Sequence, residues 1–328
     1  MEQSLPPFKI AHLSDLHLTP RDDVPRTEVS LPGKGLKGMN QIFRKILMSK
    51  EINECDFIII TGDVTDIGDN KSWRNFKKAL EAADVDKKTL VVAGNHDVCD
   101  MKWKYNISEF FKTLSKARQK ELLERIKFNL NNVEQPVQYP WKRIIDKKHR
   151  RVMFIGLDTN HSGHFYLHDN AVGRIGWGQL EKLENILKKY SGKRSKYFVP
   201  VKIIAMHHSP NLPAFETLVK RGLRKKTWFG SRLIGKAEAL STRWTHEIPA
   251  NERRALRELC LKYKVRLIIH GHMHEAMDRR VNSVRIIGAP ATTQPIKISG
   301  NKAVYQYYKY TISGTSNRLT AELKTSSI

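Results

Sequence analysis

The feature that most constrains the fold of this chain is a series of five short polar motifs, each placed after an apolar run of strand length. The apolar runs cover residues 8–13, 57–61, 90–93, 202–206 and 266–270. The motifs that follow them are Asp15-Leu16-His17, Gly62-Asp63-Val64-Thr65-Asp66, Gly94-Asn95-His96-Asp97, His207-His208 and Gly271-His272-Met273-His274. In open α/β sheets, ligands bind beyond the carboxyl ends of the strands, so the motifs are predicted to converge on one crevice.

Segments with helical periodicity separate these strands, and such alternation is the signature of an α/β fold. The pattern predicts helices at about 39–52, 72–83, 101–131, 177–187 and 250–264. Further strands are predicted at 152–157, 284–287 and 303–311, and the last residues, 324–328, are expected to be loose. The predicted fold class is therefore α/β.

The chain has 328 residues, which is enough for one large α/β domain with insertions. Two segments interrupt the alternation of strands and helices, at about 101–150 and 211–249; both are rich in basic and aromatic residues. We therefore predict a single domain over 1–328, with these two insertions forming a cap over the site.

Charge is the unusual global property of the sequence. There are 58 Lys and Arg residues against 33 Asp and Glu, for a net charge of +25. A field of this sign attracts polyanions such as nucleic acid, anionic lipid surfaces and phosphorylated metabolites. The charge is dispersed over separate clusters at 147–151, 188–196 and 220–226, so an ordinary solvated surface remains an equal alternative.

Other global features point to an intracellular protein. No stretch reaches the 18 or so uninterrupted apolar residues of a membrane span. Residues 1–7 lack the cationic and apolar regions of a signal peptide. Cys55, Cys99 and Cys260 form no CxxC pair, which argues against a disulfide framework or a zinc ribbon. We expect a cytoplasmic location, with peripheral attachment to the inner membrane under one of the functions considered below.

The residue types of the five motifs indicate metal chemistry. Taken singly, a DxH tripeptide or an isolated histidine is a weak signal; the order of all five motifs, each at a strand end, argues against coincidence. Imidazole and carboxylate together suit Mn²⁺, Fe or Zn²⁺ better than Ca²⁺ or Mg²⁺. Two ions about 3.5–4 Å apart can clamp a phosphoryl group and activate water. Two such cations need an anionic bridge, and Asp63 is the natural choice.

The series DLH, GDVTD, GNHD, HH and GHMH resembles the calcineurin-like metallophosphoesterase family, from about residue 8 to residue 290. The resemblance implies a four-layer α/β sandwich with the metal site at the carboxyl ends of the strands. It implies two metal ions with these ligands: Asp15, His17 and His274 for one, Asn95, His207 and His272 for the other, and Asp63 as the bridge. It also implies in-line attack of a metal-bound hydroxide on phosphorus. Mn²⁺ is the preferred metal, with Fe and Zn²⁺ as alternatives.

The resemblance also assigns two catalytic residues. His96 matches the family's proton donor or transition-state hydrogen-bond donor, and Asp66 matches the carboxylate that orients this histidine. His207 is preferred over His208 as the ligand because it directly follows the strand. The first-strand pattern differs from that of family members with a tyrosine iron ligand, which disfavours a purple acid phosphatase.

Three histidines outside the series, His161, His164 and His168, have the look of a metal cluster but lack glycine-anchored motifs at strand ends. These histidines could contact the substrate, bind a further metal ion, or have neither role.

The substrate is less constrained than the metal site. The motifs look most like the bacterial cyclic-nucleotide phosphodiesterase branch, which predicts a small nucleotide-type phosphodiester. The first alternative is a membrane-associated UDP-2,3-diacylglucosamine pyrophosphatase of lipid A synthesis, since basic and aromatic insertions suit a cap on an anionic membrane. The second is a nuclease, which fits the positive charge, although Leu16 stands where that branch has tryptophan. The expected partners are accordingly a small phosphorylated substrate, an anionic membrane or lipid-linked nucleotide, or nucleic acid.

Overall fold

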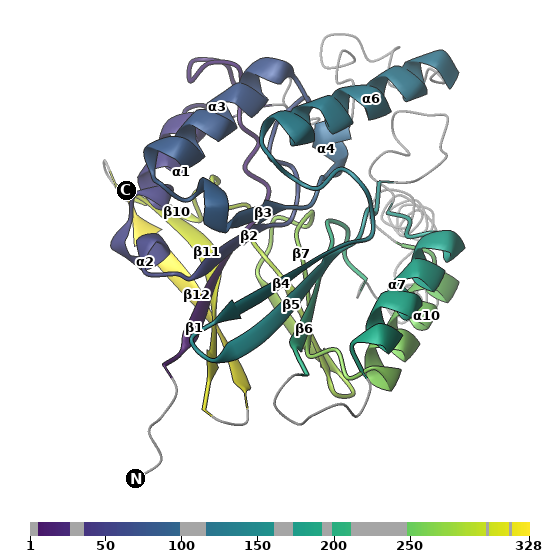
Figure 1. The fold of residues 1–328 in the computed structure, drawn as a ribbon. Helices are drawn as coiled ribbons and strands as arrows, with labels where there is room; N and C mark the ends of the chain where they lie inside the picture. The colour runs from purple at the N-terminus through teal and green to yellow at the C-terminus, as the bar shows by residue number, and fades with distance from the viewer. Residues whose placement is uncertain are drawn as a thin grey trace, which may run out of the picture.

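The computed structural model describes residues 6–26, 36–98, 116–160, 173–191, 199–210, 248–299, 302–314 and 317–328. These residues form two six-stranded sheets with helices on their outer faces (Figure 1). Within the described ranges, no helix is long and apolar enough to span a bilayer.

The first sheet has the order β10-β11-β1-β2-β3, and β12 pairs with β11. Its strands are β1 (Phe8–Leu13), β2 (Phe57–Ile60), β3 (Thr89–Val91), β10 (Lys297–Ser299), β11 (Lys302–Ser313) and β12 (Arg318–Ser327). β1, β2 and β3 are mutually parallel, with Ile10 opposite Phe57 and Ile58 opposite Thr89. Their carboxyl ends therefore open on the same edge of the sheet, where three of the polar motifs begin.

The second sheet has the order β4-β5-β6-β7-β9-β8. Its strands are β4 (Trp141–Lys147), β5 (Arg150–Gly156), β6 (Val201–Ala205), β7 (Leu267–His270), β8 (Met277–Val281) and β9 (Val284–Gly288). The four central strands β5, β6, β7 and β9 are parallel, and the two outer ones are antiparallel to their neighbours. The last two motifs follow β6 and β7, so they too lie at the carboxyl ends of parallel strands.

The helices complete a four-layer arrangement. The helices are α1 (Met39–Leu47), α2 (Lys50–Asn53), α3 (Asn70–Ala82), α4 (Asn95–Val98), α6 (Lys116–Asn132), α7 (Trp177–Lys189) and α10 (Ala250–Lys262), with a 3₁₀ turn η1 (Asp86–Lys88). α1, α3 and α6 cover the first sheet, and α7 and α10 cover the second (Figure 1). The α/β sandwich implied by the resemblance is thus confirmed.

The alternation of side chains along the strands produces these layers. In β2, Ile58 packs in the cluster under the helices, whereas Ile59 packs in the cluster between the two sheets. In α3, the Asp69 side chain caps the amino end by accepting hydrogen bonds from the backbone N–H groups of residues 71 and 72. Trp73 and Phe76, three residues apart, face the sheet and are buried. Local sequence and packing therefore specify the same arrangement.

Most predicted elements are present, with shifts of a few residues at their ends. The helix predicted at 39–52 is two helices, α1 and α2, with Met48 and Ser49 between them. Four of the described strands were not anticipated: β4, β8, β10 and β12. Residues 324–328, expected to be loose, were wrongly assigned: β12 runs to Ser327, and the backbone of Ile328 forms two hydrogen bonds with Ala303, of 2.9 and 3.0 Å.

The two predicted insertions have different outcomes. Within 101–150, residues 116–132 form α6, whose Ile126 and Leu130 pack in the core, and 141–147 form β4 of the second sheet. That part belongs to the sandwich itself, and residues 101–115 lie outside the described residues. Nearly all of the second insertion, 211–247, also lies outside them. The cap remains a prediction.

Candidate metal centre

The first two motifs run side by side at the edge of the first sheet. The backbone N–H of Asp15 donates to the carbonyl of Gly62 at 3.0 Å, and that of His17 donates to the carbonyl of Asp63 at 2.9 Å. These bonds continue the parallel pairing of β1 and β2 beyond the strands. They bring the side chains of both motifs to one side of the sheet edge.

One group of predicted ligands gathers around His17. Its members, Asp15, His17, Asp63 and His274, each offer an atom within 4.8 Å of the others. His274 Nε2 is 3.4 Å from Asp15 Oδ1 and 3.1 Å from His17 Nε2. The loops that follow β1, β2 and β7 thus supply two carboxylates and two imidazoles to one small volume.

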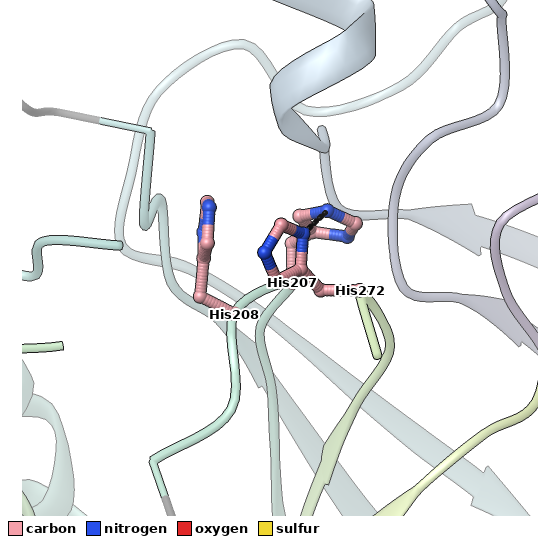
Figure 2. A group of neighbouring side chains, drawn as sticks. All are labelled: His207, His208 and His272. Carbon is pink, nitrogen blue, oxygen red and sulfur yellow. Dashed lines mark hydrogen bonds between the residues drawn. The ribbon is translucent and has the colours of Figure 1, made fainter. Parts of the chain in front are cut away.

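A second group gathers around the Asn95 side chain. Asn95 Oδ1 lies 2.9 Å from His207 Nε2 and 3.0 Å from His272 Nδ1. The two imidazole nitrogens are themselves 3.2 Å apart. Figure 2 shows the rings of His207 and His272 meeting edge to face, with His208 beside them.

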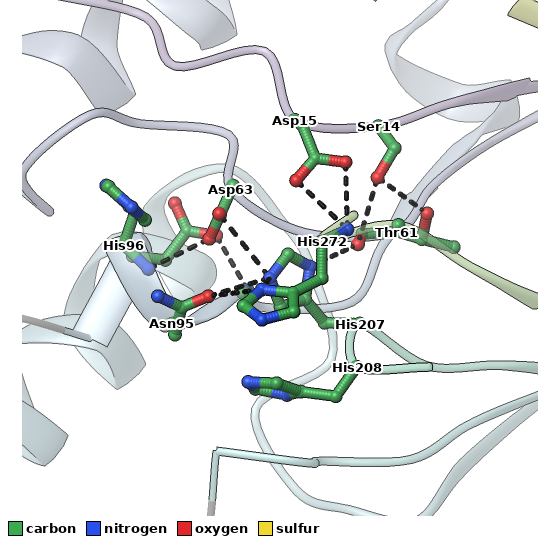
Figure 3. A network of polar contacts seen from close by, with 12 residues as sticks. Ser14, Asp15, Thr61, Asp63, Asn95, His96, His207, His208 and His272 are labelled. Carbon is green, nitrogen blue, oxygen red and sulfur yellow. Dashed lines mark hydrogen bonds and ion pairs between the residues drawn. The ribbon is translucent and has the colours of Figure 1, made fainter. Parts of the chain in front are cut away.

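Asp63 belongs to the first group and also faces His207 of the second (Figure 3). Its Oδ2 is 3.8 Å from His17 Nε2 and 3.4 Å from His207 Nε2, so a single carboxylate faces one imidazole of each group. Its Oδ1 accepts a hydrogen bond of 2.8 Å from the backbone N–H of His96. This position is the one expected of a bridging ligand.

The donor set fits two divalent ions. All seven predicted ligands come together. Two ring nitrogens lie 3.1 Å apart in the first group and 3.2 Å apart in the second, a spacing with room for at most one proton between each pair. Carboxylate, imidazole and amide oxygen donors in two groups that share one carboxylate match a two-ion phosphoester site. When bound, two such ions would supply Lewis-acid polarisation of the phosphoryl group and activation of water.

Five of the seven predicted ligands have a left-handed backbone, which non-glycine residues adopt rarely. Their φ angles are 52° for Asp15, 45° for His17, 48° for Asp63, 71° for His272 and 55° for His274. Such conformations cost on the order of 1 kcal/mol or more each and persist where the surrounding structure holds them. The strain is concentrated where the motifs turn their side chains toward the site.

Two motif glycines make this close approach feasible. Gly62 has φ of +96°, and a Cβ there would lie 2.4 Å from His207 Nδ1. A Cβ on Gly94 would lie 2.2 Å from the backbone nitrogen of Asp63. Any side chain at either position would collide with a ligand residue, which explains the glycine that begins each of these motifs.

Charges within the metal-free centre are strongly coupled. Burial opposes ionisation of Asp63, but the positive field and hydrogen bond of His207 outweigh burial and hold the Asp63 pKa well below its usual range. Burial likewise opposes protonation of His207, but the charge of Asp63 and its hydrogen bond raise the His207 pKa to about 9. In the metal-free protein at neutral pH, an imidazolium at position 207 therefore neutralises Asp63.

Metal binding is consequently predicted to release a proton at neutral pH. A metal ligand must be deprotonated, and His207 with a pKa of about 9 carries its extra proton at pH 7. Apparent Mn²⁺ affinity should rise by roughly tenfold per pH unit as pH approaches this pKa from below, and level off above it. Isothermal titration calorimetry at pH 7, in buffers of different ionisation enthalpy, measures the proton count directly. Zero proton release, with affinity constant between pH 6.5 and 8.5, would contradict the charge state assigned to His207.

His96 contacts the main chain of Asp66. Its ring Nδ1 lies 2.8 Å from the main-chain carbonyl oxygen of Asp66, which can only accept, so Nδ1 is the donor. The Asp66 carboxylate instead lies 3.6 Å from Nδ1 of His17. The peptide of Asp66 thus orients His96, while its carboxylate faces the ligand His17. A carboxylate oxygen of Asp66 also lies within 4.8 Å of a ring nitrogen of His96, and their pairing remains a prediction. The spacing of GDVTD and GNHD could not decide which group of Asp66 meets the ring.

His208 adjoins the second group, with a ring nitrogen within 4.8 Å of ring nitrogens of His207 and His272. Its Nδ1 is 2.8 Å from the Thr159 hydroxyl, and its ring centroid is 4.4 Å from that of His272. His207, by contrast, faces Asp63 and Asn95, as the sequence analysis prefers. The other histidines considered there, at 161, 164 and 168, lie outside the described residues.

Asp97 ties two of the motifs together. Its buried carboxylate accepts hydrogen bonds from the backbone N–H groups of Val64 at 3.2 Å, Thr65 at 2.9 Å and Gly94 at 2.9 Å. Burial, together with the negative charge of Asp63, raises the Asp97 pKa to about 6. This residue holds the loops that present Asp63 and Asn95.

The segment after β9 supports the first motif through hydrogen bonds that were not predicted from the sequence. Ser14 donates its backbone N–H to the Thr292 hydroxyl at 3.0 Å, and the Thr293 hydroxyl donates to the Leu16 carbonyl at 2.7 Å. Both threonines follow β9 and are fully buried. No local pattern distinguishes them from ordinary turn residues, and only their contacts across the sheet give them a role.

The fold and the site together define a hydrolase with a two-ion metal centre. The family model of calcineurin-like phosphoesterases matches residues 8–276. The chain belongs to the calcineurin-like phosphoesterase family and is an enzyme that hydrolyses phosphoester bonds.

The chain is similar to several known proteins. A protein of Coxiella burnetii (strain RSA 493 / Nine Mile phase I), named a probable cyclic nucleotide phosphodiesterase, is 25% identical over 290 residues, which are 88% of this chain and 85% of the relative. Among solved structures, a dimetal phosphatase of Danio rerio has a TM-score of 0.54 at 11% identity, over 97% of this chain and 99% of the other. A purple acid phosphatase of yellow lupin has a TM-score of 0.50 at 13% identity, over 98% of this chain and 52% of the other. At such low identity, the two structures show a shared fold alone.

Proposed function

We propose that this enzyme is a Mn²⁺-dependent phosphodiesterase that acts on a small nucleotide-type substrate. The observation that carries the proposal is the similarity to the Coxiella burnetii protein named a probable cyclic nucleotide phosphodiesterase, which extends over 88% of the chain. The net charge of +25 supports an anionic substrate, because a positive field raises its local concentration.

The burial of the centre indicates the side from which a substrate approaches. Asp15, His17, Asp63, Asn95 and His207 are all buried, with at most 5% of their surface exposed. His96, His272 and His274 are half-buried. The accessible side of the centre is therefore lined by imidazoles, and a phosphoryl group that enters there would meet His96 as it reaches the ligands.

In this arrangement His96 is placed to act on the leaving group. Its Nδ1–H is committed to the Asp66 carbonyl, so only Nε2 is left to face a substrate. A neutral ring with this tautomer accepts at Nε2, and only the doubly protonated ring donates a proton there. We assign His96, in its protonated form, the donation of a hydrogen bond or proton to the departing oxygen.

Manganese and a cytoplasmic location are part of the proposal. Imidazole, carboxylate and amide oxygen suit Mn²⁺, and no cysteine stands at a ligand position. Cys55 and Cys260 are buried free thiols, in keeping with a reducing compartment.

A substrate panel tests the proposal. The protein with Mn²⁺ is assayed on cyclic AMP, cyclic GMP, bis(4-nitrophenyl) phosphate, 4-nitrophenyl phosphate, UDP-2,3-diacylglucosamine and single-stranded DNA. We expect kcat/KM for a cyclic nucleotide to exceed that for the generic diester, despite the poorer leaving group of the nucleotide. Exclusive use of the generic diester would remove the nucleotide claim, and preference for the lipid-linked nucleotide or for DNA would replace it with the corresponding function. Repeating the assay with Zn²⁺ and Fe²⁺ tests the metal.

A further inference from the structure

A chain of buried polar groups runs beneath the metal centre, through the space between the two sheets. It begins at Tyr310 in β11, passes through His12 in β1 and reaches Thr61 at the end of β2. Tyr310 Oη lies 2.6 Å from His12 Nδ1, and His12 Nε2 lies 2.8 Å from the Thr61 hydroxyl. All three residues are fully buried.

This hydrogen-bonded series ends on His207, a predicted metal ligand. The Thr61 carbonyl accepts a hydrogen bond of 2.7 Å from His207 Nδ1. The Thr61 hydroxyl donates to Ser14 Oγ at 2.9 Å, and Ser14 Oγ donates back to the Thr61 carbonyl at 3.3 Å. Thr61 is thus held through both its side chain and its carbonyl oxygen, directly beside the residue that precedes Asp15 (Figure 3).

The direction of each hydrogen bond follows from counting protons. Thr61 has one hydroxyl proton, which it gives to Ser14, so its oxygen must accept from His12 Nε2–H. His12 is neutral, because burial, reinforced by nearby His270, lowers its pKa to about 3. Its Nδ1 therefore carries no proton and must accept the Tyr310 hydroxyl proton. One arrangement satisfies every member of the chain.

Stability alone gives no reason for these groups to be polar. His12 shares the inter-sheet face of β1 with Phe8 and Ile10, and Tyr310 packs among the apolar residues of the same cluster. Burying an imidazole and two hydroxyls there has a desolvation cost that apolar side chains would avoid. A satisfied polar chain in such a place orders its members in one geometry.

We propose that Tyr310, His12 and Thr61 form a positioning chain that fixes the orientation and tautomer of His207. With the Thr61 carbonyl held in place, His207 Nδ1 remains the protonated nitrogen, and Nε2 is aimed at Asp63 and Asn95, where an ion would bind. Partners of this kind that orient metal ligands typically contribute 10–100-fold to metal affinity. The inference rests on the metal centre and not on the identity of the substrate.

Direct measurement of Mn²⁺ binding to the metal-free protein tests whether these hydrogen bonds support metal affinity. Thr61→Val keeps the peptide carbonyl and the side-chain shape but removes the hydroxyl that links it to His12. We expect it to weaken binding by about tenfold or more, and Tyr310→Phe to weaken binding in the same direction by a smaller factor. The double variant should lose less than the product of the two single effects, because both changes break one chain.

Tyr308→Phe is the matched control. Tyr308 is two residues away on the same strand, is buried, and stacks on Tyr310 with ring centroids 6.2 Å apart. We expect Tyr308→Phe to bind Mn²⁺ as the parent protein does. Thermal unfolding of each metal-free variant shows that affinity is compared between folded proteins.

Wild-type Mn²⁺ affinity in both Thr61→Val and Tyr310→Phe would overturn the inference, as would an equal loss in Tyr308→Phe. The substrate proposal fails separately: a parent protein that binds two Mn²⁺ ions but leaves cyclic nucleotides intact refutes that function without touching the binding comparison. Loss of affinity in the two chain variants, with the control unaffected, supports the inference in either case.

Discussion

Asp63→Ala is expected to abolish tight binding of both metal ions and, with it, all measurable phosphoesterase activity. The Asp63 carboxylate faces His17 at 3.8 Å and His207 at 3.4 Å, so it belongs to both ligand groups. Its removal takes a ligand from each ion at once and leaves two mutually repelling cations without an anion between them. Metal content by atomic emission spectroscopy should fall from two ions per chain to a small fraction of one. Activity with added Mn²⁺ should fall by at least ~10⁴-fold, because no remaining group substitutes for the ions.

Two further variants separate charge from structure. Asp63→Asn retains an oxygen that can accept the His96 backbone N–H, so it tests the loss of negative charge with the loop geometry kept. We expect it to be folded and to bind metal far more weakly than the parent. Asp56 is the control, since this carboxylate stands before β2, at the other end of the strand from Asp63, and pairs with Lys147 and Lys148. Asp56→Asn should keep both ions. Retention of two tightly bound ions in Asp63→Ala would refute the bridging position.

The motifs could be read from the sequence because each is local. Glycine, the ligand residue and the end of an apolar strand are neighbours in the chain, and parallel strands bring their carboxyl ends to one edge whatever lies between them. The order of the motifs thus predicted that Asp15 and His274, 259 positions apart in the numbering, would meet, and their side chains lie 3.4 Å apart. The prediction depended on one physical rule: loops that follow parallel strands lie at the same edge of the sheet.

The edge strands could not be predicted in the same way. β4 has the sequence WKRIIDK, and six of its seven residues are charged or isoleucine side chains that alternate poorly between buried and exposed faces. β12 has Leu319, Ala321 and Leu323 among polar residues, and none of its residues is fully buried. Backbone hydrogen bonds to β5 and β11 hold these strands, and such pairing does not require the continuous apolar run that marks the central strands.

Support for the ligands is also non-local. His12 meets Tyr310 across 298 positions of the chain, and Ser14 meets Thr292 across 278. In the sequence, His12 only interrupts the apolar run of its strand, and nothing near Tyr310 indicates that the two residues meet. The left-handed backbone of five ligands is similarly hidden, because Asp and His seldom adopt it without the contacts that surround them here.

His96→Ala is expected to keep both metal ions and to lose most of its turnover, by ~10²–10⁴-fold if the ring is a positioned proton donor. His96 is not one of the seven predicted ligands, and alanine keeps the backbone N–H that donates to Asp63. Its ring lies beside the ligand His17, with ring centroids 4.6 Å apart, and within 4.8 Å of the Asp66 carboxylate. The substitution removes the imidazole that the Asp66 carbonyl holds at the half-buried side of the centre. Metal content should therefore match the parent, while kcat falls.

The leaving group distinguishes proton donation from a general disturbance of the site. A 4-nitrophenolate departs without needing a proton, whereas the alkoxide of a nucleoside ring needs one at the transition state. If His96 protonates the leaving oxygen, His96→Ala should lose far more kcat on a cyclic nucleotide or an alkyl ester than on bis(4-nitrophenyl) phosphate. An equal loss on all esters would indicate that His96 stabilises charge on the phosphoryl group without transferring a proton. Undiminished turnover on every ester would remove His96 from the mechanism, and the half-buried His272 and His274 would then be the imidazoles left at the accessible side.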